Sequence, residues 1–315
     1  MMRYRRLGRT GLAISEITIG TGGLAGGAVD ADAARAAIGL ALDGGVNAIE
    51  MAAGNADAAG IVASALERRD SARDVHVLAR PTSLLPFDLP SPHVHAQQAY
   101  PGRHIRAETE ALLQTLGIER LAVQQIHAWC PEWLNEGDWL ETLGRLRDEG
   151  KIAGIGISLW DHDVDAALEA VSSGAVDCVQ LLYNIFDPGA AARLLPLCRR
   201  QDVGVIARSP LYYGALTARI EEEVPFAAGE WRRAYFFDDH LNETRLRAQR
   251  LARELQDGGP VAETALRFSL SHPAVSTIVV GMLSPSHVES NVKAIEKGPL
   301  DAAALQRLAL HKWLC

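Results

Sequence analysis

The sequence predicts a protein of the α/β class that folds as a single (β/α)8 barrel with a β-hairpin at its N-terminal end. Short apolar runs alternate with amphipathic stretches along almost the whole chain, a pattern typical of parallel strands joined by helical crossovers. Eight such runs lie after the hairpin, which is the number that a barrel of this kind needs. The 315 residues, 48% of them hydrophobic, suffice for a barrel of about 250 residues with insertions, so we expect one domain over residues 1–315.

The hairpin is expected first. Residues 3–7 and 12–15 flank the segment Gly8-Arg9-Thr10-Gly11, and glycine allows the backbone to turn tightly between two short strands. Because this hairpin precedes the first barrel strand, we expect it to close the bottom of the barrel.

Strands and helices are expected to alternate after the hairpin. The candidate barrel strands are residues 17–21, 46–50, 75–79, 121–126, 155–158, 178–181, 205–209 and 277–280. Between them, residues 32–42, 107–116, 139–149 and 164–172 carry apolar side chains at every third or fourth position, as amphipathic helices do. Glycines stand just past the ends of these stretches, where helices commonly stop, namely Gly44, Gly45, Gly117, Gly150 and Gly174.

Two long segments interrupt this alternation, residues 81–104 after the third strand and residues 218–240 after the seventh. In a barrel, the loops that follow the carboxyl ends of the strands build the active site. We therefore expect both segments to shape a substrate site, the alternative being surface excursions without such a role.

The composition narrows the choice of partners. The net charge is −8 and the 31 lysines and arginines are scattered, which argues against binding to nucleic acid or anionic lipid. No apolar stretch has the length of a membrane span or follows the basic start as a signal peptide would. We expect a cytoplasmic protein with a small-molecule substrate, and the oligomeric state stays open.

The cysteines are far apart in the sequence and form no CxxC pair. This spacing favours reduced thiols over a disulfide framework or a zinc site, so no metal site is expected. The four residues are Cys130, Cys178, Cys198 and Cys315.

Four segments together resemble the aldo-keto reductase superfamily. They are RYRRLGRTGLAISEITIGTGG, LLQTLGIERLAVQQIH, EGKIAGIGIS and IARSPLYYGALT, and they follow one another in the order and at the separations found in that family. The resemblance covers nearly the whole chain. It implies the TIM-barrel fold and the reduction of a carbonyl group by a nicotinamide hydride.

The resemblance also locates the catalytic positions. The family usually carries Asp, Tyr, Lys and His at the mouth of the barrel, and only the histidine is kept here, as His127. The Asp position falls on Glu50 and the Lys position on Arg80. The Tyr position falls on Asn55, or on Gly54 if the shortened loop aligns differently.

These substitutions change the chemistry that the resemblance implies. The family's tyrosine donates a proton to the carbonyl oxygen, whereas the amide of Asn55 can hold an oxygen but has no proton to release near neutral pH. Glu50 and Arg80 keep their charges, and an arginine can clamp an anion or stabilise an enolate but cannot shuttle protons. Alternatively, Glu50 and Arg80 form an inherited buried ion pair that persists because a lone partner would be costly.

Other side chains at the mouth could transfer protons. His127 should lie at the carboxyl end of a strand and is suited to proton transfer or to orienting a substrate, although a satisfied structural histidine is the alternative. Tyr100, Tyr212 and Tyr213 could each return a phenol to the mouth, or could be packing residues.

Cofactor positions are kept in part. By resemblance, Ser158 and Gln180 hold the nicotinamide carboxamide, while Leu159 stands where the family commonly has Asn. The segment 209–217 resembles the loop around the pyrophosphate, since glycine and backbone amides suit close approach to an anion. The residues assigned to that loop are Ser209, Leu211, Gly214 and Leu216.

The stretch that begins at Gly281 resembles the family's adenosine site, with Gly281, Ser284 and Asn291 matching it. Its arginine is Leu283 here, so the 2′-phosphate of NADP lacks its charge partner and NAD should be tolerated better. Ser284 with the following proline would also fit a plain helix cap. The cofactor is therefore expected to be NADP or NAD.

Three hypotheses on function follow. The first is a nicotinamide-dependent oxidoreductase acting on a small carbonyl or alcohol, with an anionic substrate compatible with Arg80. The second is a non-redox isomerase, epimerase or lyase in which Glu50 or His127 removes a proton and Arg80 clamps an anion. The third is a barrel that binds a ligand or partner without catalysis.

Overall fold

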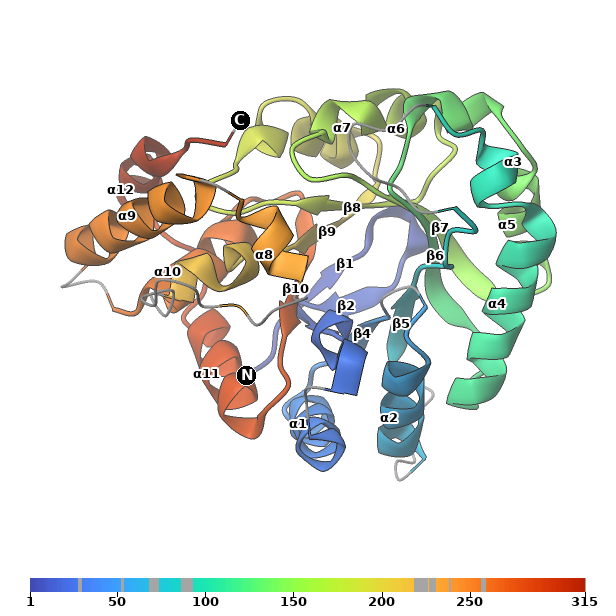
Figure 1. The fold of residues 1–315 in the computed structure, drawn as a ribbon, viewed down its shortest axis with the longest axis horizontal. Helices are drawn as coiled ribbons and strands as arrows, with labels where there is room; N and C mark the ends of the chain where they lie inside the picture. The colour runs from blue at the N-terminus through green and yellow to red at the C-terminus, as the bar shows by residue number, and fades with distance from the viewer. Residues whose placement is uncertain are drawn as a thin grey trace.

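The computed structural model describes residues 1–27, 30–51, 54–67, 74–85, 93–217, 226, 231–237, 239–255 and 259–314. It confirms the predicted (β/α)8 barrel, since eight parallel strands close in the order β10-β3-β4-β5-β6-β7-β8-β9 (Figure 1). These strands are β3 (Ile17–Gly20), β4 (Ala48–Met51), β5 (His76–Ala79), β6 (Leu121–His127), β7 (Ile152–Ser158), β8 (Cys178–Leu182), β9 (Gly204–Arg208) and β10 (Val275–Gly281). The ring closes between its first and last strands, where Ile278 pairs with Ile17.

Helices surround the ring of strands (Figure 1). They are α1 (Ala31–Asp43), α2 (Ala56–Leu66), α3 (Ala96–Ala99), α4 (Gly102–Leu116), α5 (Trp139–Asp148), α6 (Leu168–Ser173), α7 (Leu194–Arg200), α8 (Trp231–Tyr235), α9 (Asp239–Glu254), α10 (Val261–Ser271), α11 (Pro285–Glu296) and α12 (Ala302–Leu308). The helices that connect successive strands cover the outer, apolar face of the barrel, as a parallel sheet requires, whereas α3 and α8 belong to the two long loops. Among the described helices, none is both long enough and apolar enough to cross a bilayer.

The predicted hairpin is confirmed as a plug at the amino end of the barrel. Strand β1 (Tyr4–Arg6) pairs with β2 (Ala13–Ser15) in antiparallel fashion. Leu7 and Ile14 are fully buried and pack against the inward residues at the starts of the barrel strands. Gly8 has a φ of 49°, and a Cβ there would lie 2.2 Å from the amide nitrogen of Gly204. The mouth of the barrel is therefore at the opposite, carboxyl end.

Several predicted boundaries shift for local reasons. The strand expected from residue 46 begins at Ala48, because Asn47 binds the hairpin through Ser15 and Ala13. The strand expected to end at Ser209 ends one residue earlier, because Ser209 has a left-handed φ of 53°. The helix expected over 164–172 divides into a 3-10 turn (Val164–Ala167) and α6.

The described parts of the two long loops pack at the mouth. The first loop contains α3 and Tyr100, whose side chain is 2% exposed. The second contains α8, with Phe226 and Phe236 buried on either side of it. Residues 86–92, 218–225, 227–230 and 238, which the sequence placed in these loops, lie outside the described residues, as does Cys315.

Candidate active site

The strand register gathers five of the predicted residues at the mouth. His127 and Ser158 are the last residues of β6 and β7 and pair with each other, and Ser158 pairs in turn with Gln180 on β8. Glu50 lies near the end of β4, and Arg80 directly follows β5. Side chains from five neighbouring strands can thus meet inside the ring.

Glu50 and Arg80 form the predicted charge pair. The Nη2 atom of Arg80 lies 2.7 Å from Oε1 of Glu50, and the two side chains are 13% and 4% exposed. Gln180 donates to the same carboxylate oxygen through Nε2 at 3.5 Å. Both neighbours thus contact the same carboxylate oxygen, Oε1 of Glu50.

His127 continues this chain of contacts. Its Nδ1 lies 3.3 Å from Nη1 of Arg80 and 3.0 Å from Oγ of Ser158. A guanidinium only donates, so Nδ1 accepts and the proton of the neutral ring is on Nε2. Burial, then the charges of Arg80 and Arg208, hold the pKa of His127 well below its usual value. The ring is therefore a neutral hydrogen-bond donor, able to polarise a carbonyl oxygen.

Asn55 has a structural role that the sequence did not suggest. It is the N-cap of α2, and its Oδ1 accepts from the amide of Ala58 at 3.0 Å. Its Nδ2 is buried and has no hydrogen-bond partner among the described residues. The amide nitrogen is thus the part of Asn55 that remains for an oxygen of a ligand. Gly54, the alternative position, has a left-handed φ of 66°.

Two of the three candidate tyrosines use their hydroxyls to hold the loops. Tyr100 donates to the backbone carbonyl of His127 at 3.1 Å, and burial raises its pKa. Tyr212 is buried at the second loop, where its hydroxyl lies 2.9 Å from Nε2 of His240 and accepts from Tyr235 at 3.3 Å.

Tyr213 belongs to a second charged group at the mouth. Its hydroxyl donates to Oδ2 of Asp161 at 2.6 Å and accepts from Nη1 of Arg208 at 2.9 Å. Arg208 also pairs with Asp161, at 2.5 Å. Burial raises the pKa of Tyr213 to about 12, while Arg208 acts in the opposite direction. A phenol, a guanidinium and a carboxylate thus stand together at the mouth.

Sequence reasoning missed Arg208 and Asp161. Arg208 is the last residue of β9, and a charged residue at the carboxyl end of a barrel strand could have indicated the site. Asp161 follows β7 by three residues, and Trp160 beside it lies 6.4 Å from the ring of His127. The pairing of the two residues depends on how the loop after β7 folds back towards the end of β9, for which the sequence carries no signal.

The segment expected to bind the pyrophosphate forms a loop, but some of its backbone amides already donate hydrogen bonds within the loop. Its backbone is left-handed at Ser209, Tyr212, Tyr213 and Gly214, a concentration of strain common at binding sites. The amides of Gly214 and Leu216 both donate to the carbonyl of Leu211 at 3.0 Å. The expectation that those two amides face an anion therefore requires this turn to rearrange.

The expected adenosine stretch forms the start of α11. Ser284 is the N-cap and accepts from the amide of His287 at 3.4 Å, so the helix-cap alternative is realised. Leu283 packs on Gly23, since a Cβ on that glycine would lie 2.6 Å from it. Asn291 is 8% exposed, whereas a Cβ on Gly281 would meet no atom within 4 Å.

A nicotinamide dinucleotide fits these residues in part. Oε1 of Gln180 is buried and has no hydrogen-bond partner within the described part of the chain, so it can accept from a carboxamide. The hydroxyl of Ser158 is already shared with His127. Leu283 offers no charge to a 2′-phosphate. The chain thus offers more matching groups to the nicotinamide end of a dinucleotide than to a 2′-phosphate at its adenosine end.

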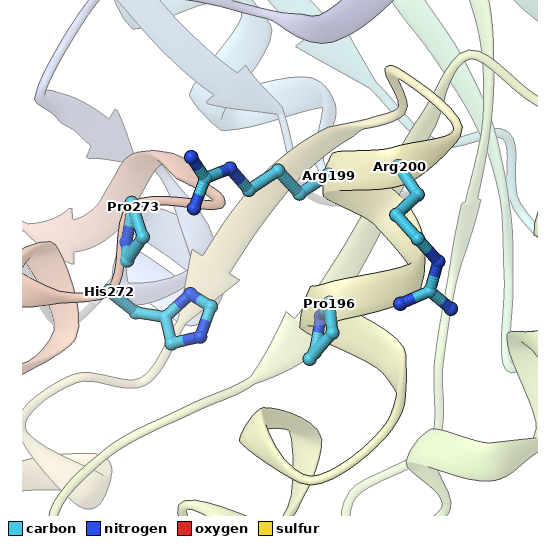
Figure 2. A pocket seen from close by; sticks show the side chains of 5 residues that line it. All are labelled: Pro196, Arg199, Arg200, His272 and Pro273. Carbon is cyan, nitrogen blue, oxygen red and sulfur yellow. The ribbon is translucent and has the colours of Figure 1, made fainter.

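A shallow groove lies at the other end of the barrel (Figure 2). Figure 2 shows Arg199 reaching from α7 towards Pro273, while the guanidinium of Arg200 turns away. The residues that line the groove lie in α7 and directly after α10, just before β9 and β10 begin. The groove therefore opens on the hairpin side of the barrel. Active sites of this fold occupy the carboxyl side, and we assign no catalytic role to the groove. It is lined by Pro196, Arg199, Arg200, His272 and Pro273.

Known proteins resemble this chain in sequence. A family model described as the aldo/keto reductase family matches residues 16–311. An NADH-specific methylglyoxal reductase of Escherichia coli is 30% identical over 206 residues, which are 64% of this chain and 62% of that protein. An L-galactose dehydrogenase of Arabidopsis thaliana is 33% identical over 159 residues, 50% of this chain and 46% of that protein. The matched segments span less than two thirds of either relative.

Solved structures share the fold over the whole chain. The holo form of an aldo-keto reductase from Bacillus halodurans superposes with a TM-score of 0.78 at 23% identity, covering 100% of this chain and 98% of that one. At this identity the likeness concerns the barrel and its connections.

Proposed function

The chain belongs to the aldo/keto reductase family, and we propose that it is a nicotinamide-dependent oxidoreductase acting on a small carbonyl or alcohol. One observation carries the proposal. Glu50, Arg80, His127 and Ser158 form a continuous chain of contacts at the mouth, and Gln180 joins it with a free, buried acceptor. Groups suited to a substrate oxygen and to a carboxamide thus occupy one site.

In this proposal, His127 is the residue that contacts the substrate oxygen. Its Nε2 proton polarises the carbonyl, and the neutral ring is maintained because burial and two guanidiniums disfavour the imidazolium. Arg80 is a positioning residue that fixes the ring through Nδ1 and is itself fixed by Glu50. A bound nicotinamide supplies or accepts the hydride.

Tyr213 is the proposed source of the proton. Reduction of a carbonyl to an alcohol needs one proton on the oxygen in addition to the hydride. The hydroxyl of Tyr213 now donates to Asp161, so in this step it turns from that carboxylate to the substrate oxygen and transfers its proton there. Arg208 donates to the phenol oxygen and stabilises the phenolate that is left, after which solvent restores the proton. Asp161 keeps Arg208 in place. This group would replace the phenol that is absent at Asn55.

The substrate is proposed to be small and to carry an anionic group. Arg80 contacts the ring of His127, and the charges of Arg80 and Arg208 both lower the pKa of that histidine. Two guanidiniums near the ring would favour a carboxylate or phosphate next to the carbonyl. NAD is the proposed cofactor because Leu283 cannot pair with a 2′-phosphate. The cytoplasmic location and the lack of nucleic-acid or membrane partners stay predictions.

Cofactor titration tests this proposal first. NADH and NADPH are added to the protein while cofactor fluorescence is recorded, and we expect NADH to bind more tightly. Gln180→Ala should weaken binding by about tenfold, as loss of a buried hydrogen bond does. Gln114→Ala, an exposed residue on the outer face of α4, is the matched control and should leave binding unchanged. No binding at millimolar cofactor would end the proposal.

Turnover with a panel of 2-oxo acids and aldehydes tests whether the protein reduces a carbonyl substrate once the cofactor is bound. His127→Ala should abolish reduction of any substrate that the wild type accepts. If the protein instead exchanges substrate protons with solvent deuterium without a cofactor, the non-redox alternative applies. Cofactor binding with no turnover on the panel would favour the barrel that binds without catalysis.

A further inference from the structure

The loops that follow β5 and β6 are fastened to each other beside the mouth. Trp133 donates through Nε1 to the carbonyl of Val94 at 2.7 Å, and the amide of Ala96 donates to Oε2 of Glu136 at 3.0 Å. Trp133 also packs edge-on against Tyr100, with ring centroids 5.6 Å apart. These contacts give both loops a defined position, so side chains carried on them meet in a reproducible geometry.

Three side chains with different donor atoms converge where the loops meet. Nδ1 of His93 lies 3.8 Å from Sγ of Cys130, and the thiol donates to Oε2 of Glu132 at 2.6 Å. All three donor atoms lie within 4.8 Å of one another. Bonds to zinc are about 2.0–2.3 Å long, so ligand atoms around a tetrahedral ion are separated by about 3–4 Å. Small side-chain adjustments would bring all three onto one ion.

A second observation points independently to a cation. The other ring nitrogen of His93, Nε2, lies 3.0 Å from Oε1 of Glu136, whose second oxygen is held by the amide of Ala96. A histidine that donates one ring nitrogen to a fixed carboxylate presents the lone pair of the other, and this arrangement accompanies metal-ligating histidines almost always. The lone pair on Nδ1 faces the sulfur of Cys130.

We propose that His93, Cys130 and Glu132 form a binding site for a divalent cation of the zinc type. Sulfur, imidazole and carboxylate are the ligands that zinc takes. One thiolate and one carboxylate also neutralise the two charges of the ion. Binding releases the thiol proton to solvent, and three protein ligands leave a fourth position for water.

The site would brace the catalytic side of the barrel without taking part in hydride transfer. Cys130 follows His127 by three residues, and the ion would join the loop after β6 to the loop after β5. The proposal departs from the expectation of free thiols, because the ligands come from two loops rather than from a short motif. It does not depend on the nicotinamide site, so the two can be tested separately.

Cobalt is the probe for the test, because a thiolate bound to Co²⁺ absorbs in the near ultraviolet. Full-length protein without a polyhistidine tag is freed of metal with a chelator and titrated with Co²⁺. We expect the thiolate band at one equivalent, and displacement of Co²⁺ by one equivalent of Zn²⁺. Failure to see this band in the folded wild type would overturn the proposal.

Variants locate the site. Cys130→Ser and His93→Ala should each remove the band or weaken Zn²⁺ binding by at least tenfold, and Glu136→Gln should weaken it by about 10–100-fold. His95→Ala is the matched control, since its ring lies near Glu136 but is not a proposed ligand, and it should keep the band. Zinc binding unchanged in Cys130→Ser would overturn the proposal. NADH affinity measured on the same variants reports on the nicotinamide site, and circular dichroism confirms that each is folded.

Discussion

The carboxylate of Glu50 and the guanidinium of Arg80 form a 2.7 Å ion pair at the mouth of the barrel, with only 4% and 13% of the two side chains exposed. Each charge has therefore lost most of its water and depends on the other. The pair also holds His127, because Arg80 contacts its Nδ1. Stability and the geometry of the proposed active site are thus coupled in one contact.

Breaking this pair should destabilise the protein strongly. Arg80→Met leaves the Glu50 carboxylate buried without a partner and should lower the free energy of unfolding by about 3–5 kcal/mol. Combining it with Glu50→Gln should recover much of that loss, because no unpaired charge remains. Urea unfolding near neutral pH measures both changes. The control is Arg145→Met, whose pair with Glu141 is exposed and should change stability by less than about 1 kcal/mol. Equal losses of stability in Arg80→Met and Arg145→Met would contradict the prediction.

The pH profile should show no titration of His127 in the neutral range. Because its pKa is well below the usual value, the ring stays neutral between about pH 6 and 8, and kcat/KM should have no imidazole limb there. Arg208→Gln removes a positive charge, which stabilises the imidazolium and raises the pKa. In this variant the titration of His127 should therefore appear in the pH profile of kcat/KM closer to neutral pH. A wild-type limb near pH 6.5 that Arg208→Gln does not shift would refute this interpretation of the histidine.

Removing the hydroxyl of Tyr213 should slow the reaction. If this phenol delivers the proton, Tyr213→Phe should reduce kcat by about 100-fold to 10,000-fold, the usual contribution of a general acid, with a small effect on KM. Tyr4→Phe is the control, since that hydroxyl bonds to Gly45 at the hairpin end. Steady-state kinetics on both variants measure the difference. A kcat of Tyr213→Phe within a few fold of the wild type would exclude Tyr213 as the donor.

The contact between His162 and Asp187 should make stability depend on pH. Nδ1 of His162 lies 2.6 Å from the carboxylate, and this hydrogen bond raises the pKa of the histidine. Because the pKa is higher in the folded state, the contact contributes its full stabilisation at pH values below about 6.5, the pKa of histidine in the unfolded chain. The contribution is lost as the pH rises through the higher folded value. The side chain is 37% exposed, so screening limits the contribution to about 1 kcal/mol.

The variant His162→Asn tests this dependence, because asparagine tolerates the left-handed φ of 65° at this position. The difference in unfolding free energy between wild type and variant should be largest at acid pH and shrink towards alkaline pH. Thermal unfolding across the pH range measures it. A difference that grows as the pH rises would contradict the assigned direction.

The hairpin plug should contribute to stability without affecting the mouth. Leu7 is fully buried at the bottom of the barrel, and Leu7→Ala should lower the free energy of unfolding by about 2–5 kcal/mol by leaving a cavity. Leu246→Ala, at a side chain that is 59% exposed, should change it by about 0.5 kcal/mol or less. Urea unfolding compares the two, and NADH affinity should be the same in both folded variants.

The sequence was sufficient to predict the fold and the strand-borne part of the site. Glu50, His127, Ser158 and Gln180 occupy strands whose apolar runs are evident, and strand ends in a closed barrel must converge. Their register follows from the closure of the ring rather than from any local choice. The resemblance to the aldo-keto reductase superfamily assigned the four positions, and the predicted strands placed them at one end of the barrel before their distances were known.

The loop-borne part could not be predicted for a physical reason. Asp161 meets Arg208 only because the segment after β7 folds towards the end of β9, and His93 meets Cys130 because two other loops approach each other. Such contacts have no periodicity in the sequence. Asn55 is a milder case, since its capping role depends on where α2 begins to within one residue.

The closure of the barrel between β3 and β10 has a consequence for biosynthesis. The partner of β3 is encoded roughly 250 residues downstream, and a ribosome adding about 5–20 residues per second needs roughly 10–50 seconds to reach it. During that interval the nascent chain carries an unpaired strand edge, the kind of surface that recruits other chains. Chains that terminate before Val275 would keep that edge permanently open. Chaperone contact with the emerging polypeptide should accordingly persist until the last barrel strand has left the exit tunnel.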